Sequence, residues 1–178
     1  SKKDLEKVNL AQELPTLLKN TPSVLTTSDS GSGIGYSSIR IRGSDQSRVN
    51  VTINGVPYND SESMSVYWVN LPDFASSIES IQIQRGVGTS TNGSAAFGGS
   101  INILTNAASE NASFEINNSL GSFNTVKNSV GFSTGFINDK FELSGRLSRI
   151  KSSGYIDRSG SKLRSYFLQG IYKDENTL

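Results

Sequence analysis

Residues 78–105 read IESIQIQRGVGTSTNGSAAFGGSINILT, and this stretch decides the fold. Apolar and polar residues alternate along residues 81–84 and again along residues 101–103, which predicts two half-buried strands. So many glycines in the connecting loop predict positive φ angles or very close backbone approach. We therefore expect a tightly folded loop without a catalytic side chain. Its glycines are Gly86, Gly88, Gly93, Gly98 and Gly99.

Two upstream segments carry the same kind of signal. Residues 39–42 alternate so that Ile39 and Ile41 share one face of a predicted strand, with arginines on the other face. Residues 49–53 form another predicted strand, and the following Asn54-Gly55 pair predicts a two-residue hairpin. Together with residues 78–105, these segments predict a small sheet.

These three segments, in this order, resemble the plug signatures of TonB-dependent receptors. Residues 79–86 (ESIQIQRG) and 95–103 (AAFGGSINI) are similar to the closing signature, which runs from an acidic residue through a strand, Arg-Gly, a small-residue loop and an aromatic-Gly pair to a strand ending in Asn-Ile. Residues 39–43 and 51–57 resemble the earlier signatures. The resemblance assigns the signature loop to Gly86, Gly88, Gly93, Phe97, Gly98 and Gly99.

Composition excludes several other functions. The 178 residues contain no cysteine and no histidine, which removes disulfides, thiol catalysis and every Ser-His-Asp triad. The net charge of +1 gives no basic excess that would indicate nucleic acid as a partner. Apolar residues make up 34% of the chain, and no apolar run approaches the ~18 residues of a transmembrane helix. We expect neither enzymatic activity nor a metal or cofactor.

The second half of the chain has a different sequence pattern, with longer alternating segments. Val126, Val130 and Phe132 alternate with Lys127 and Ser129, and three further segments show related alternation. Strands of about ten residues with this dyad pattern are typical of an outer-membrane barrel wall, although an ordinary antiparallel sheet shows it too. We divide the chain into a plug domain, residues 1–106, and the first four or so strands of a transmembrane barrel, residues 107–178.

The predicted fold class is thus an α+β plug domain, a small mixed sheet with short helices, followed by antiparallel β-hairpins of an incomplete outer-membrane β-barrel. Four strands cannot close a barrel, and the resemblance implies about 22, so we expect a piece of a larger protein. Residues 4–20 predict an amphipathic helix interrupted at Pro15, with Asn9 as cap of its second part. Residues 72–77 predict one helical turn with Pro72 at its first position.

Arg42 and Arg85 each precede a glycine at the end of a predicted strand. They could be solvated strand-end arginines. The resemblance implies instead that they form ion pairs with glutamates on the inner barrel wall, which would lie beyond Leu178. The planar, permanently charged guanidinium suits such a buried pair.

A set of aromatic and amide side chains lies in or beside the predicted loops. The resemblance implies that such loops face an extracellular ligand, which stacking and a few hydrogen bonds would hold. Each residue could alternatively pack within the plug. By resemblance the ligand is an iron complex, a siderophore or haem, with cobalamin or a glycan as alternatives. The residues are Tyr36, Gln46, Tyr58, Tyr67 and Trp68.

The resemblance also implies partners and a location. A TonB-type energy-transducing protein would contact a segment upstream of Ser1, and barrel strands would contact outer-membrane lipid. Two other functions remain open. The chain could be a free-standing plug-like binding module, or a hydrolase using Asp60 and Glu62, the clustered loop acids near aromatic residues.

Overall fold

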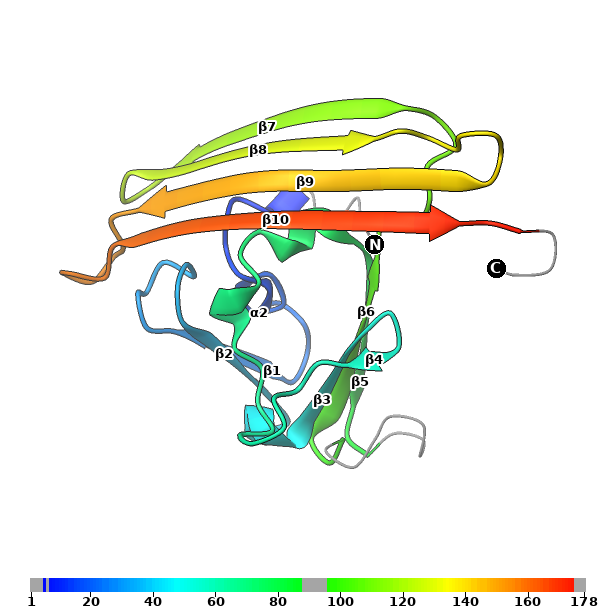
Figure 1. The fold of residues 1–178 in the computed structure, drawn as a ribbon. Helices are drawn as coiled ribbons and strands as arrows, with labels where there is room; N and C mark the ends of the chain where they lie inside the picture. The colour runs from blue at the N-terminus through cyan, green and yellow to red at the C-terminus, as the bar shows by residue number, and fades with distance from the viewer. Residues whose placement is uncertain (1–4, 6, 88–95, 175–178) are drawn as a thin grey trace.

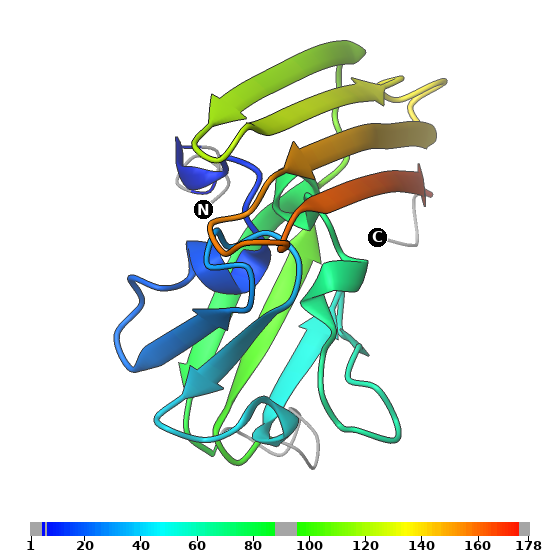
Figure 2. The same ribbon diagram turned by 90° about the vertical axis from the view of Figure 1, so that its left-hand side faces the viewer.

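A curved antiparallel sheet lies across one side of a mixed α+β unit (Figure 1). The computed structural model describes residue 5, residues 7–87 and residues 96–174. Figure 2, turned by 90°, shows the same curved sheet arching over the mixed unit. This arrangement agrees with the predicted fold class of a plug followed by wall strands. We call the mixed unit the plug and the curved sheet the wall.

The plug contains a four-stranded sheet in the order β4-β3-β6-β5. Its strands are β3 (Val49–Ile53), β4 (Val56–Pro57), β5 (Ile78–Arg85) and β6 (Gly99–Thr105). The β3–β6 pair is parallel, whereas β3–β4 and β5–β6 are antiparallel. Asn54 and Gly55 have φ angles of 51° and 80°, as a two-residue hairpin with both central residues at positive φ requires. The predicted hairpin is confirmed.

Smaller elements pack around this sheet. Strands β1 (Val24–Ser28) and β2 (Ser37–Ile41) form an antiparallel pair, and helix α2 spans Leu14–Leu17. The described part of the plug also contains three short 3₁₀ helices: η1 (Gln46–Arg48), η2 (Trp68–Asn70) and η3 (Phe74–Ser77). The apolar faces of these elements meet in one core. Its most deeply buried side chains include those of Ile39, Ile41, Val49, Val51, Trp68, Ile78, Ile101 and Ile103.

Both predicted helix starts are wrong in detail. Asn9 does not cap α2. Glu13 takes the capping position and Pro15 lies in the first turn, where its missing N–H costs nothing. Asn9 instead donates a hydrogen bond through Nδ2 to Ser76 Oγ at 2.9 Å. Pro72 does not start η3, because the preceding residue of that helix is Asp73 in a left-handed conformation.

The wall consists of β7 (Ser113–Gly121), β8 (Thr125–Ser133), β9 (Phe141–Ser152) and β10 (Ser161–Tyr172), each antiparallel to its neighbour. Along β8 and β9 the plug-facing side chains are mainly polar and buried, among them Lys127, Ser129, Arg146 and Ser148. The predicted separation of faces is confirmed for these two strands. None of the helices in the described ranges is long and apolar enough to cross a membrane.

The plug and the wall meet through apolar and polar contacts. Phe74 of η3 packs edge-on against Phe167 of β10, with ring centroids 6.4 Å apart. Ile34 packs with Ile150 of β9 in a second small cluster. Gln169 of β10 donates a hydrogen bond to the backbone oxygen of Asn106 at 2.8 Å. Strand β6 ends at Thr105 and β7 begins at Ser113, while the division at residues 106 and 107 remains a proposal.

Candidate functional site

The most deeply buried charged cluster of the described chain lies where the plug meets the wall, and Asp73 is its centre. Asp73 lies between η2 and η3 with φ 55° and ψ 22°, a left-handed conformation that aspartate tolerates better than most residues. This turn directs its carboxylate toward the wall sheet. The residue is only 2% exposed.

Two cations on neighbouring wall strands contact the Asp73 carboxylate. Lys127 Nζ of β8 lies 2.5 Å from Oδ1, and Arg146 Nη1 of β9 lies 2.8 Å from Oδ2. Ser148 Oγ, also on β9, donates a further hydrogen bond to Oδ2 at 2.6 Å. One plug carboxylate therefore joins two strands of the wall.

Plug hydroxyls complete the network. Ser76 Oγ donates to Asp73 Oδ1 at 2.6 Å and accepts from Lys127 Nζ at 3.0 Å. Arg146 Nε donates to Ser77 Oγ at 2.9 Å. Lys127 and Arg146 thus each have a hydrogen-bond partner on η3 in addition to Asp73. We call these residues, Asp73, Ser76, Ser77, Lys127, Arg146 and Ser148, the latch network.

The electrostatics of the latch network keep Asp73 ionised. Burial by itself would raise the pKa of Asp73, but the adjacent Lys127 and Arg146 charges and the hydrogen bonds hold that pKa below its ordinary value. The carboxylate therefore stays negative at neutral pH. One negative and two positive charges leave this buried cluster with excess positive charge.

A polar cavity of about 740 Å³ lies beside the latch network, between the plug and the inner face of the wall. Its lining includes Ser76, Lys127, Arg146 and Glu142. Glu142 is 1% exposed, and its Oε1 accepts from Ser133 Oγ at 2.7 Å. A polar space of this size holds water, so hydration is available next to the charged contact.

The predicted wall-pairing arginines lie elsewhere on the plug. Arg42 directly follows β2 in a left-handed conformation with φ 52°, and its Nη1 lies 2.9 Å from the position that a Cβ on Gly86 would take. The structure thus brings Arg42 next to the residue that follows Arg85. Both arginines are exposed in the described chain. Their pairing with wall glutamates stays a prediction.

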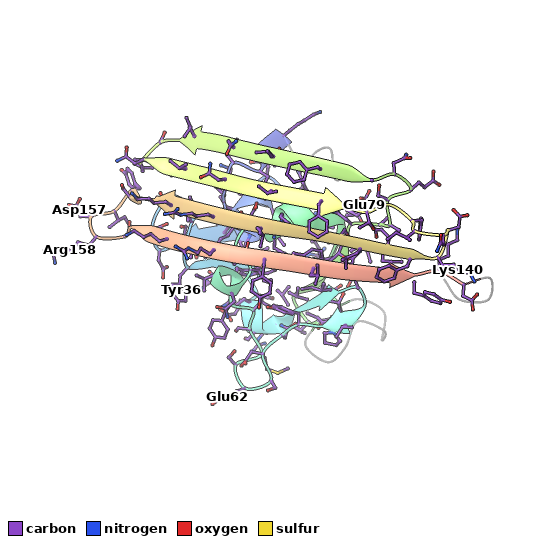
Figure 3. The ribbon with its side chains drawn as sticks, turned by 45° about the horizontal axis from the view of Figure 1, so that its top comes forward. Tyr36, Glu62, Glu79, Lys140, Asp157 and Arg158 are labelled. Carbon is purple, nitrogen blue, oxygen red and sulfur yellow. The ribbon has the colours of Figure 1, made fainter. Side chains whose placement is uncertain are left out.

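The predicted ligand residues do not form one cluster. Tyr36 (Figure 3) precedes β2 and is 62% exposed, whereas Gln46 lies in η1, which follows the opposite end of that strand. Tyr58 and Tyr67 are partly exposed at 38% and 46%. Trp68 is 2% exposed and belongs to the plug core. Of the five predicted ligand residues, the three tyrosines are therefore the ones that offer aromatic surface to a ligand in this conformation.

The signature loop is partly described. Gly88 and Gly93 lie outside the described residues. A Cβ on Gly99 would come within 2.6 Å of the backbone oxygen of Gln84, so the predicted close backbone approach exists there. Phe97 is 63% exposed, and the Arg48 guanidinium carbon lies 5.9 Å from its ring centroid.

Asp60, one of the two loop acids, lacks the electrostatics of a general acid. Asp60 Oδ1 accepts hydrogen bonds from the backbone N–H groups of Ser63 and Glu62, at 2.7 and 3.1 Å. The Ser63 bond is the main cause that lowers the pKa of Asp60, whereas a general acid needs a raised pKa. Within the described ranges, no group of three or more acidic side chains could hold a metal ion.

A second buried carboxylate has the opposite electrostatics. Glu13 is 2% exposed and accepts hydrogen bonds from Ser37 Oγ and from the backbone N–H of Gly35. Burial raises its pKa from 4.5 to about 7, although both hydrogen bonds oppose the shift. Glu13 therefore changes its charge near neutral pH.

We expect Glu13→Gln to stabilise the loop of residues 29–36 above pH 7. Because the folded pKa is raised, the unfolded state ionises first, and Glu13 costs stability progressively between pH 4.5 and about 7. Glutamine cannot ionise and so removes that cost. The free energy of unfolding should rise by roughly 2–3 kcal/mol at pH 8 and change little at pH 4. Hydrogen exchange of this loop in the full-length protein, measured from pH 5 to 8, checks the result. An identical pH profile in both proteins would contradict it.

Comparison with known proteins identifies the protein family of this chain. Residues 1–100 match the model of the TonB-dependent receptor plug domain. The chain belongs to this family. Its relatives include a vitamin B12 transporter, BtuB of Vibrio vulnificus, which is 33% identical over 156 residues. That alignment covers 87% of this chain and 24% of the relative.

Other relatives are receptors for iron complexes. The probable TonB-dependent siderophore receptor PirA of Acinetobacter baumannii is 30% identical over 115 residues, covering 59% of this chain and 15% of that protein. Its crystal structure aligns with a TM-score of 0.66 at 23% identity, over 99% of this chain and 29% of that chain. The ferric yersiniabactin receptor FyuA of Yersinia pestis aligns at 0.71 with 17% identity, over 97% and 28%. The matched proteins are receptors and transporters, not enzymes.

Proposed function

We propose that this chain forms the plug and the first wall strands of an energy-coupled outer-membrane transporter. The latch network is the observation that carries the proposal, because it fastens the plug to the inner face of the wall by charged and hydroxyl groups. The chain covers only part of its curated relatives, 24% of BtuB and 15% of PirA. The activity of the whole protein is therefore part of the proposal.

The chemistry of the latch network suits a plug that must be both seated and releasable. Desolvation offsets most of the attraction within a buried ion pair, so moving Asp73, Lys127 and Arg146 into water together costs little net free energy. The same geometry permits only one well-paired seated position. The adjacent polar cavity supplies the water that the separated charges need. An apolar contact of the same area would hold the plug without this reversibility.

For the ligand we propose an iron complex, a siderophore or haem. Support comes from the siderophore receptors among the relatives and from the exposed tyrosines, whose rings and hydroxyls suit a polyfunctional chelate. Cobalamin is the second candidate, favoured by the 33% identity with a vitamin B12 transporter over most of the chain. Arg42 and Arg85 remain proposed ion-pair partners for wall glutamates. A TonB-type protein remains the proposed energy source.

Uptake by intact cells tests this function. A strain lacking the full-length gene and a complemented strain are given radiolabelled ferric siderophores, haem and cobalamin, with and without a protonophore. We expect one ligand to accumulate only in the complemented, energised cells, and to bind at the surface without accumulating when the protonophore is present. Accumulation that ignores the protonophore, or no accumulation of any of these ligands, would contradict the proposal.

A further inference from the structure

The outer face of the wall, turned away from the plug, is ordered in rows by the strand register. Phe114 pairs with Phe132 and Ile116 with Val130 across β7 and β8. Leu147 continues the second row on β9. These side chains are all exposed, so two neighbouring rows present apolar surface across the four strands. The rows consist of Phe114, Phe132, Gly145 and Leu168, and of Ile116, Val130, Leu147 and Tyr166.

The next two rows carry basic residues on β9 and β10. Arg149 lies directly opposite Arg164, and Lys151 lies directly opposite Lys162. All four side chains are exposed on the same outer face as the apolar rows. We call Arg149, Lys151, Lys162 and Arg164 the basic quartet. Figure 3 views this face, with the loop that carries Asp157 and Arg158 beyond the end of these strands.

Like charges directly opposite one another destabilise an antiparallel pair. Strand β8, the other neighbour of β9, places no negative charge opposite these residues, because Asn128 lies opposite Arg149 and Val126 opposite Lys151. In the described part of the chain, no acidic side chain forms an ion pair with any member of the basic quartet. Within the described residues, four cations are thus concentrated on two strands without an ion-pair partner, which leaves this surface open to an external anion.

We propose that the basic quartet binds the phosphate headgroup of an anionic membrane lipid. The inference rests on the proposed function, in which the apolar rows face lipid. Successive rows on one face are about 7 Å apart along a strand, so a headgroup at the quartet places its acyl chains over the rows that contain Leu147 and Tyr166. A free phosphate ion gains nothing from those rows. Cations at this level attract anionic lipid headgroups electrostatically.

The test compares two doubly substituted full-length proteins of equal charge. Arg149→Gln with Lys151→Gln removes two members of the quartet. Lys140→Gln with Arg158→Gln removes two cations from turns at opposite ends of the wall (Figure 3). Phosphatidylglycerol is titrated into each protein in a neutral detergent and bound lipid is counted by native mass spectrometry. Phosphatidylcholine and inorganic phosphate serve as the competing probes.

We expect the quartet variant to bind phosphatidylglycerol about thirty-fold more weakly than the wild type, and the control to bind within about twofold. Phosphatidylcholine and inorganic phosphate should not displace the lipid. Equal binding by both variants, or displacement by inorganic phosphate alone, would overturn the lipid site. If the double variant does not insert, Arg149→Gln and Lys162→Gln singly should each weaken binding about fivefold.

Locating the wild-type protein in cell fractions distinguishes a failure of the lipid site from a failure of the proposed transporter function. Wild-type protein that inserts and takes up its ligand, yet shows no preference for phosphatidylglycerol, would overturn the lipid site and leave the transporter intact. Wild-type protein that is absent from the outer-membrane fraction would overturn both.

Discussion

Replacing Asp73 with asparagine is expected to free the plug from the wall, at a cost of about 3–5 kcal/mol. The substitution keeps the volume of the side chain but removes the only carboxylate of the latch network. Lys127 and Arg146 then remain buried against the plug without a counter-charge. The penalty arises from those two desolvated cations more than from the lost attraction.

Urea unfolding of the plug within the full-length protein measures this effect. These 178 residues contain no cysteine, and in a full-length protein whose only cysteine is Ser63→Cys, in an exposed loop, an environment-sensitive label reports on the plug. Asp29→Asn is the matched control, because Asp29 is an exposed plug carboxylate and should cost no more than about 0.5 kcal/mol. Similar midpoints for Asp73→Asn and Asp29→Asn would show that the latch network does not hold the plug.

The second large effect is expected at Trp68. Trp68→Ala should destabilise the plug by about 3–5 kcal/mol, because it removes the largest fully buried side chain of the core and leaves a cavity. Trp68→Phe should cost less, about 1–2 kcal/mol, since Nε1 has no hydrogen-bond partner in the described chain and none is lost. The same urea experiment measures both variants.

Ligand affinity distinguishes a core role from a ligand contact. Trp68→Phe, once folded, should bind the transported ligand within about twofold of the wild type, because the indole does not reach the surface. Tyr36→Phe provides the comparison at an exposed ring. A variant Trp68→Phe with unchanged stability and about tenfold weaker ligand binding would mean that Trp68 contacts the ligand after a change in the plug.

Local patterns in the sequence predicted the strands well. Alternation placed β3, β5 and β6 close to their observed bounds, and Asn54-Gly55 predicted the hairpin between β3 and β4. The parallel pairing of β3 with β6 could not be predicted in this way. It joins segments about fifty residues apart, and alternation indicates which face is buried but not which strand is adjacent.

The latch network was missed for the same physical reason. Asp73 is separated from Lys127 and Arg146 by a long stretch of chain, and in the sequence it is one of several scattered acids. A usable signal existed on the wall side. Lys127 and Arg146 stand on the plug-facing faces of β8 and β9 among serines and glycines, and a charge on a buried face requires a partner. The identity of that partner depends on tertiary structure.

The burial of Trp68 could not be predicted from its position in a predicted loop. It follows a polar segment, where an aromatic side chain is compatible either with ligand contact or with packing. In a short 3₁₀ helix no long hydrophobic period indicates the buried face. Pro72 was misplaced because a proline often begins a helix, whereas here Asp73 adopts the left-handed turn that separates Pro72 from η3.

A double-mutant cycle between Asp73 and Arg146 tests most directly that the latch network seats the plug in the wall. Unfolding of the plug in the full-length protein is measured for Asp73→Asn, for Arg146→Gln and for the two together. The network predicts that the double variant is less destabilised than the sum of the single variants, by about 1–3 kcal/mol, because Arg146 is costly to bury once Asp73 is gone and the second substitution removes that cost. Effects that add within about 0.3 kcal/mol would show that the two groups do not interact and would contradict the account.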